Sequence, residues 1–253
     1  MIISDVPGKI TCPHCGREKY ILALTSGNTF SAEIWSDSRR YYPMLHYPSS
    51  IQKCYHCSHY FFLEDAQCGM ADVVTIDGLQ KEIKWPSLFD WNVDHKEEQD
   101  KTPEMIEMEE IRNRINEDVS KNRFGELTYR ELAEGEKELL QDGVSEKRRL
   151  EYLYAYLFAY NDAKYGRANV DLETVPEQFQ KLFHDCAMAL IECCGEDKVI
   201  TAELWRELGN FDKSKELCQR LIAAGTDVEV VQQILERAEQ KNTDAFILHF
   251  DED

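Results

Sequence analysis

The sequence has no apolar run close to the roughly eighteen residues that a membrane-spanning helix requires, and its start lacks the basic-then-apolar order of an export signal. We therefore expect a cytoplasmic protein that does not cross a membrane. Disulfides are rare in the reducing cytosol, so the nine cysteines are expected to be free thiols or metal ligands. With 253 residues and 43% hydrophobic side chains, the chain can bury one large core or two modest ones.

Motifs of the common enzyme classes are also missing. The sequence contains no G-x-x-x-x-G-K, G-x-S-x-G, H-E-x-x-H or G-x-G-x-x-G pattern. Carboxylates are dense in residues 107–118, but no histidine accompanies them at helical spacing, so a solvated helix face is the favoured interpretation. The isolated His184 is expected to be packed rather than catalytic. We expect no enzymatic activity.

What the chain does have is a large negative charge, unevenly distributed. The formal net charge is −19; residues 1–60 carry about +2 and the remainder about −21. A negative field repels phosphate backbones and anionic membrane surfaces. Nucleic acid is therefore not expected to bind the later part of the chain, and a protein or peptide partner, in particular a basic one, is favoured.

The chain changes character twice. Residues 1–70 are rich in aromatic side chains and poor in helical periodicity, which predicts short strands and loops. Residues 71–103 hold alternating apolar pieces and end in HKEEQDKTP, which predicts an irregular or β cover and a charged linker. Residues 104–253 show helical periodicity. Helices are predicted over residues 104–122, 128–142, 145–165, 176–194, 198–208, 212–224 and 227–241.

Local capping signals place the boundaries of these helices. A threonine followed three residues later by glutamate forms a capping box, in which each side chain satisfies a backbone amide of the other residue. Such boxes are predicted at Thr128 with Glu131, Thr174 with Glu177, and Thr226 with Glu229. Glycines provide the helix ends, and Gly209 is predicted to take a left-handed conformation between two antiparallel helices.

Residues 203–218 read ELWRELGNFDKSKELC, which resembles a tetratricopeptide repeat. A large residue, a glycine turn and an aromatic let two antiparallel helices close, and the small Ser214 stands where they approach most tightly, in place of the usual alanine. Only this unit fits the repeat, so a generic helical hairpin is the alternative. The predicted architecture is an antiparallel helical array of tetratricopeptide-like character.

Four cysteines form two Cys-x-x-Cys turns, Cys12 with Cys15 and Cys54 with Cys57. Two such turns supply the four thiolates of a tetrahedral zinc site, and nearby backbone amides donate to the sulfurs. The 38 residues between the turns exceed the roughly 15 to 20 of a compact ribbon, so additional strands or a loop are expected there. Reduced thiols without a metal, or a redox role for one pair, are the alternatives.

Residues next to the cysteines leave one ligand open. His14 and His56 lie inside the turns and are expected to be exposed, whereas His59 is an alternative ligand to Cys57. Ser58 stands where glycine commonly follows the second pair, so that turn is expected to be less regular. With four thiolates the site is closed, and no position is left for the water that a catalytic zinc activates. The predicted zinc is therefore structural.

These features resemble the bacterial family catalogued as domain of unknown function 2225. The likeness rests on the N-terminal C-P-x-C, the Arg-, Asp- and Tyr-rich middle segment, the second C-x-x-C followed by aromatics, and the late Leu-Trp-Arg-Glu-Leu-Gly-Asn-Phe hairpin. It covers the first 65 or so residues and roughly residues 198–224. The resemblance implies a bacterial cytoplasmic protein with a zinc-ribbon-like module and tetratricopeptide-like helices, and it supplies no activity.

Two further segments permit a functional interpretation beside a structural one. Residues 35–42, WSDSRRYY, place Arg39 and Arg40 beside stacking aromatics, a combination used in single-stranded nucleic-acid binding. The same residues also suit the core and rim of a small zinc module. The tyrosine-rich helix over residues 145–165 is expected to be buried centrally, and its alternative role is a groove for a peptide, with Asn161 and Asp162 as polar anchors.

Together these features predict an α+β, mostly α protein. A zinc-ribbon-like module is expected at residues 1–70, a cover and linker at 71–103, and a tetratricopeptide-like helical domain at 104–253. The predicted function is non-enzymatic protein binding or scaffolding by the helices, with zinc fixing the N-terminal module. The alternative is nucleic-acid binding through the ribbon. A single surface that contains all four of the following basic side chains would favour this alternative: Arg17, Arg39, Arg40 and Lys53.

Overall fold

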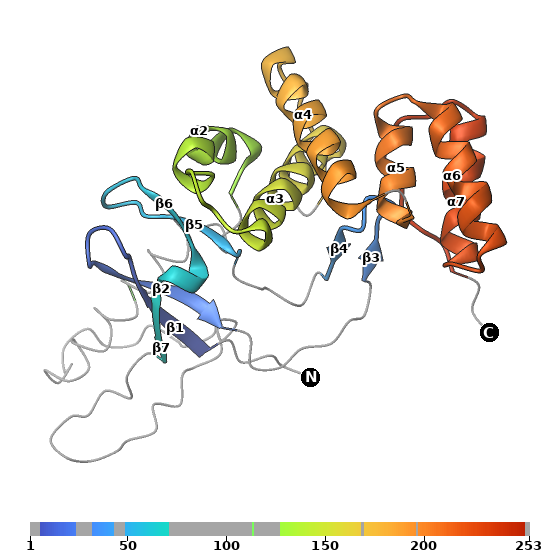
Figure 1. Cartoon of the computed structure of the whole chain (residues 1–253). Coiled ribbons are helices and arrows are strands. Elements are labelled where there is room, and N and C mark those ends of the chain that lie inside the picture. The colour runs from blue at the N-terminus through green and yellow to red at the C-terminus, as the bar shows by residue number, and fades with distance from the viewer. Residues whose placement is uncertain are drawn as a thin grey trace, which may run out of the picture. The chain divides into compact units, whose positions relative to one another are not determined.

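The structure, a computed structural model, describes residues 6–23, 32–42, 49–70, 113, 127–167, 170–195 and 197–250. The predicted cover over residues 71–103 lies outside the described residues, as does the predicted helix over 104–122 except for Asn113. Contacts divide the chain into two compact units (Figure 1). Of the described segments, 6–23 and 49–70 belong to the first unit, and 32–42 and 127–250 belong to the second.

The first unit is built from short antiparallel strands. Strand β1 (Val6–Thr11) lies between β2 (Glu18–Ala23) and β7 (Gln67–Met70) in a three-stranded sheet. Strands β5 (Ile51–Lys53) and β6 (Tyr60–Phe62) form a separate hairpin, followed by the short 3-10 helix η1 (Leu63–Asp65). The expectation of short strands in this part of the chain is confirmed.

The core of the first unit includes two of the candidate metal ligands. Cys12 and Cys54 are buried together with Ile10 and Phe61. A buried hydrogen bond at 2.8 Å from Nζ of Lys19 to Gln52 links β2 to β5. The cysteine turns therefore lie against the apolar core of their unit.

The second unit is mostly helical (Figure 1), with six helices among the described residues. They are α2 (Tyr129–Leu139), α3 (Glu146–Tyr165), α4 (Glu177–Cys194), α5 (Val199–Glu207), α6 (Phe211–Ala223) and α7 (Val228–Glu239). Each helix packs on the next along the chain, as in an antiparallel array. Among the described helices, none has both the length and the apolarity to cross a bilayer.

Local side chains determine where three of these helices begin. The capping box of Thr128 with Glu131 forms at the start of α2 as predicted, with both reciprocal hydrogen bonds present. Ser145 accepts a hydrogen bond from the third residue of α3, and Asn210 does the same at α6. These caps satisfy amides that the first helical turn leaves without intrahelical partners.

The other two predicted capping boxes are wrong. Helix α4 begins after Pro176 rather than after Thr174, and Pro176 has no side-chain acceptor for the first turn. Helix α7 begins after Asp227, whose side chain makes no capping hydrogen bond, so Thr226 lies one residue too early. In both cases the sequence places the start of the helix within one residue, but the threonine hydroxyl is outside the capping position.

Helices α5, α6 and α7 share one hydrophobic core. Its fully buried members are Ala202, Leu217, Cys218, Leu221, Val231 and Ile234. Gly209 joins α5 to α6 with φ +76°, so the predicted left-handed turn is confirmed. Ser214 is fully buried on α6, as expected for a small residue between two closely packed helices.

The tyrosine-rich helix α3 packs on both α2 and α4. The hydroxyl of Tyr152 donates to the carbonyl of Leu132 at 3.2 Å, and that of Tyr156 donates to the carbonyl of Phe179 at 3.2 Å. Both rings are fully buried. The interpretation of this helix as a central core element therefore holds for these tyrosines.

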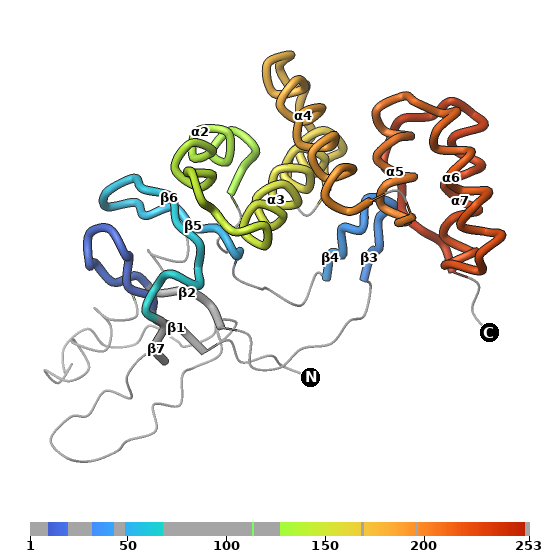
Figure 2. The backbone as a smooth tube through the Cα atoms, in the orientation of Figure 1, coloured from blue at the N-terminus to red at the C-terminus, as the bar shows by residue number. Residues whose placement is uncertain are grey.

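One β-hairpin from the early chain belongs to the helical unit (Figure 2). Strands β3 (Glu33–Ile34) and β4 (Arg40–Tyr41) pair with each other, and Trp35 forms an antiparallel bridge with Ile247 near the end of the chain. This hairpin comes from within residues 1–70 of the sequence, yet contacts group residues 29–43 with residues 127–253. We call residues 33–41 the inserted hairpin.

Candidate functional site

The two cysteine turns of the first unit have the same backbone geometry. In the first, the amide of Cys12 donates to the carbonyl of Arg17 at 2.9 Å. In the second, the amide of Cys54 donates to the carbonyl of His59 at 2.9 Å. Each turn connects two strands, β1 to β2 and β5 to β6, so the ladders hold the turns in place.

The four thiols of these turns lie close together. The sulfurs of Cys12, Cys15, Cys54 and Cys57 all lie within 4.8 Å of one another. Across the two turns, Cys12 Sγ is 3.9 Å from Cys57 Sγ, and Cys15 Sγ is 3.7 Å from Cys54 Sγ. A tetrahedron with metal–sulfur bonds of about 2.3 Å has edges of about 3.8 Å. The arrangement therefore fits one metal ion held by four sulfurs.

Burial and hydrogen bonding act differently on the four thiols. Donation from the backbone amide of Arg17 lowers the pKa of Cys15 to about 7, against the opposing effect of burial. Burial, with a smaller contribution from the other three sulfurs, raises the pKa of Cys57 to about 12, against the opposing hydrogen bond from the backbone of His59. Burial also raises the pKa of Cys12. A cation among the sulfurs offsets the cost of ionising all four thiols, because metal binding favours the thiolate form.

The second cysteine turn is as regular as the first, contrary to the expectation based on Ser58. The φ of Ser58 is +61°, close to the +68° of Gly16, which follows the first pair. The amide of Ser58 donates to Cys54, as that of Gly16 donates to Cys12. The two turns are therefore equivalent, and the serine accepts the left-handed conformation that glycine adopts at lower cost.

The histidines near the cysteines lie outside the sulfur cluster. His14 and His56 are exposed, as expected for residues inside such turns. The ring of His59 stacks on that of His14 at a centroid distance of 4.5 Å. Because Cys57 itself completes the sulfur set, the geometry favours Cys57 over His59 as the fourth ligand. Nδ1 of His56 is 3.1 Å from Nη1 of Arg17.

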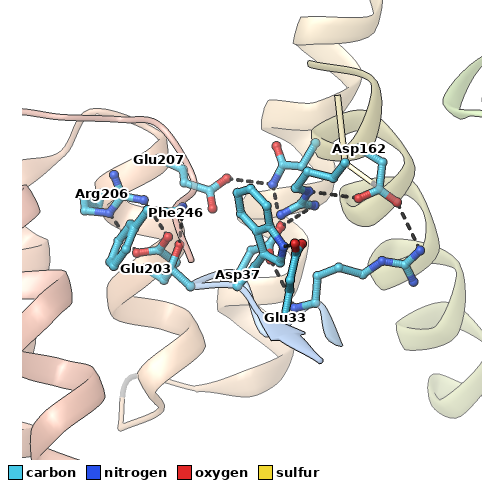
Figure 3. Close-up of polar contacts among 12 residues, drawn as sticks. Glu33, Asp37, Asp162, Glu203, Arg206, Glu207 and Phe246 are labelled. Carbon is cyan, nitrogen blue, oxygen red and sulfur yellow. Dashed lines mark hydrogen bonds and ion pairs between the residues drawn. The ribbon is translucent and has the colours of Figure 1, made fainter. Parts of the chain in front are cut away.

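A second cluster of polar side chains lies in the helical unit, around the inserted hairpin (Figure 3). At its centre is Asp37, which is fully buried in the turn between β3 and β4. Its Oδ2 accepts a hydrogen bond from Nδ2 of Asn161 at 2.8 Å and lies 2.9 Å from Nη2 of Arg167. The guanidinium of Arg167 also lies over the ring of Trp35, 4.6 Å from its centroid.

The cluster extends along α3 through Asp162. This carboxylate accepts from Nε of Arg167 at 2.9 Å and from Nη2 of Arg39 at 3.1 Å. The guanidinium of Arg39 lies over the ring of Phe158, 5.3 Å from its centroid. Asp162 thus connects Arg167, just beyond the end of α3, to an arginine of the inserted hairpin.

The cluster also reaches α5 through Glu207. Nδ2 of Asn161 donates to Oε2 of Glu207 at 3.2 Å. Burial is the largest effect on this carboxyl and raises its pKa well above the usual range, and the negative charges of Glu203 and Asp37 act in the same direction. The opposing influences are Arg206 and the hydrogen bond from Asn161.

The arginines proposed for nucleic-acid binding are divided between the two units. Arg39 and Arg40 belong to the helical unit, and Arg17 and Lys53 belong to the first. Arg39 is engaged by Asp162, and Lys53 Nζ lies 4.8 Å from the ring centroid of Tyr60. Trp35 and Arg39 therefore make contacts within the helical unit, whereas Arg40 is exposed.

The structure also bears on the expectations for His184 and for the proposed peptide anchors. His184 is exposed rather than packed, with Asp185 beside it at 3.8 Å. Asn161 and Asp162, proposed as anchors for a peptide, do contact a polypeptide segment, namely the inserted hairpin. Sequence reasoning missed Asp37 and Arg167, because a single buried ion pair between distant segments leaves no periodic pattern.

No family model, no curated protein and no solved structure matches the chain. The resemblance to domain of unknown function 2225 stays a prediction.

Proposed function

We propose that this is a non-enzymatic protein-binding or scaffold protein. Its helical unit binds a polypeptide, and a zinc ion held by Cys12, Cys15, Cys54 and Cys57 fixes the fold of the N-terminal unit as a ribbon-like module. The metal has a structural role in this proposal, since four thiolates close the coordination sphere to substrate and water.

The proposal of protein binding rests on the contacts that the helices make with residues 33–41. This segment holds the only combination of arginines and aromatics that the sequence offers to nucleic acid between the two cysteine turns. Arg39 is instead ion-paired to Asp162 of α3, and Asp37 is fully buried against Asn161 and Arg167. A surface that already recognises an extended chain segment is suited to polypeptides.

Charge supports the same class of partner. Residues 127–253 carry 27 acidic against 15 basic side chains. That field repels phosphate backbones and attracts polypeptides with basic segments. In the described part of the first unit, Lys19 is buried and bonded to Gln52, so it offers little to a phosphate.

Zinc is proposed from the chemistry of the donors. Four sulfurs in a tetrahedron suit zinc, and also iron as a single ion, because both accept thiolate ligands in this geometry. The backbone amides that donate to the sulfurs, such as that of Arg17, offset the negative charge of four thiolates. Zinc is the ion that needs no redox partner for a structural role.

The test uses the full-length protein with a photo-crosslinking residue in place of an exposed side chain. In one version it replaces Gln219 on α6 of the helical unit, and in the other it replaces Glu18 on β2 of the first unit. Each version is exposed to a lysate of the source organism with and without nuclease. Binding of a labelled single-stranded oligonucleotide is measured over a range of salt concentrations in parallel.

We expect nuclease-resistant crosslinks to protein from the Gln219 position, and no oligonucleotide affinity that depends on salt. Nuclease-sensitive capture from the Glu18 position alone, together with oligonucleotide binding that weakens steeply with salt, would instead establish the alternative, nucleic-acid binding through the N-terminal unit.

A further inference from the structure

The main-chain contacts of the inserted hairpin are those of strand addition. The amide of Leu248 donates to the carbonyl of Ile34 at 2.8 Å, and the amide of Ser36 donates to the carbonyl of Phe246 at 2.9 Å. The hairpin thus pairs along the C-terminal segment of the helical unit. Proteins that bind extended peptides often gain affinity from main-chain bonds of this kind and take specificity from side-chain contacts beside them.

The specific contact of the hairpin is its acidic turn. Asp37 is fully buried, and its carboxylate faces Arg167, whose side chain is 1% exposed, and Asn161, which is also buried. Burial of an ion pair removes two charges from water, and this desolvation cost offsets much of their attraction. The pair therefore contributes more to selectivity for an acidic residue than to stability. A chain without a carboxylate at this position leaves the buried Arg167 with one counter-charge, Asp162, in place of two.

The polar character of this contact differs from that of a folding core. Among the described residues, the buried atoms without a hydrogen-bond partner include four in this cluster: Oδ1 of Asn161, Oε1 of Glu207, and Nη1 and Nη2 of Arg167, the last of which is ion-paired to Asp37. The α5–α6–α7 core is formed mainly by apolar side chains and a cysteine, and these helices also bury Oγ of Ser214 without a partner and the ion pair of Glu203 with Arg206. Polar, incompletely satisfied contacts are more typical of surfaces between separately folded parts than of a domain interior.

The origin of the hairpin in the chain points the same way. Residues 29–43 belong to the helical unit, yet they lie in the sequence between two segments of the other unit. The helical unit therefore receives a segment that its own continuous chain, residues 127–253, does not supply. This is the relation of a receptor to a tethered ligand.

We propose that the surface formed by α3, Arg167 and residues 246–248 is a polypeptide-binding site that the inserted hairpin occupies as a ligand in cis. The external partner of this site is a polypeptide hairpin whose turn presents a carboxylate to Arg167 and, two residues later, an arginine to Asp162, as Asp37-Ser-Arg39 does. This inference rests on the proposed function and names the binding surface. Tethering gives the hairpin a high effective concentration, so an external partner must displace it.

The test uses the full chain and a fluorescently labelled peptide of residues 32–42, AEIWSDSRRYY. One protein variant carries Asp37→Asn, and a second carries Asp37→Asn together with Trp35→Ala. Both variants alter only the hairpin, so the receiving surface on the helices stays unchanged. Binding is followed by fluorescence anisotropy, and helix content by circular dichroism.

We expect the peptide to bind both variants at least tenfold more tightly than it binds the wild-type chain, whose site is filled. A peptide with Asp37→Asn should bind the variants at least tenfold more weakly than the original peptide. A peptide with Arg40→Ala is the matched control and should bind like the original, because Arg40 is exposed.

Three results would overturn the inference. The first is equal affinity of the peptide for the wild type and the variants. The second is no binding of the peptide to variants that keep their helix content. The third is loss of helix content in both variants, which would make the hairpin part of the core. If the inference fails but the proposed function holds, crosslinks from Gln219 to other proteins would still form. The two failures can therefore be distinguished.

Discussion

Arg206 and Glu203 form a buried two-bond ion pair on one turn of α5, and neither side chain is exposed. Nε of Arg206 donates to Oε2 of Glu203 at 2.8 Å, and Nη1 donates to the carbonyl of Asn242 beyond α7. The same guanidinium lies over the ring of Phe246, 5.2 Å from its centroid. The arginine of the Leu-Trp-Arg-Glu-Leu-Gly run thus holds the C-terminal segment that pairs with the inserted hairpin.

Removal of one partner of this pair should be costly. Arg206→Met leaves Glu203 buried without its counter-charge, and a loss of about 3–5 kcal/mol in the free energy of unfolding is expected. The double variant Glu203→Gln with Arg206→Met should lose less than the two single variants combined. Chemical denaturation measures these values. The control is Lys215→Met, which breaks an exposed pair at the same i,i+3 spacing and should cost about 1 kcal/mol or less.

Glu207 makes the stability of the helical unit depend on pH. Its pKa is raised in the folded protein, so its contribution is fully present below the pKa of the unfolded chain and is lost as the pH rises through the folded value. Glu207→Gln should therefore become more stable relative to wild type as the pH rises from about 4.5. Melting temperatures across this range measure the difference, with Glu216→Gln on the exposed face of α6 as the control. A constant difference would contradict the account.

Gly209 is required for its backbone conformation rather than for space. Its φ is +76°, and an added Cβ would meet only Thr243 Cγ2, at 4.0 Å. Gly209→Val should lower the free energy of unfolding by about 1–2 kcal/mol, since side chains disfavour the left-handed region. Gly209→Asn should lose less, because asparagine tolerates this region better. An unchanged melting temperature for the valine variant would count against the strained turn.

The two cysteine turns allow a reciprocal exchange of residues. Ser58 has φ +61° in the turn where Gly16 has +68°. Ser58→Gly should stabilise the N-terminal unit by about 0.5–1 kcal/mol, and Gly16→Ser should destabilise it by a similar amount. Thermal unfolding of metal-loaded protein tests both. Shifts of the same sign in the two variants would show that the turns are not equivalent.

Much of the helical unit is predictable from the sequence because helix signals are local. All six described helices begin within one residue of the predicted position. Apolar periodicity and glycine ends operate over a few residues, and Gly209 shows that even a backbone angle follows from such a pattern. The failed capping boxes at Thr174 and Thr226 show the limit, since the same motif occurs one or two residues before the true start.

The candidate metal site is predictable for a different reason, and the inserted hairpin is not predictable. Two Cys-x-x-Cys turns specify a chemistry that requires them to meet, whatever lies between them. The pairing of Asp37 with Arg167 carries no such requirement, since each residue alone resembles an ordinary charged surface side chain. Only the folded chain shows that both are buried and in contact.

The metal content of full-length protein, purified without added metal, tests the central claim most directly. We expect about one zinc per chain by elemental analysis, loss of the metal in Cys54→Ser, and retention in Cys193→Ser, which changes a thiol outside the cluster. The Cys54→Ser protein should also lose structure in its N-terminal unit, because such sites contribute directly to folding. A wild-type protein that is free of metal and fully folded would contradict the account.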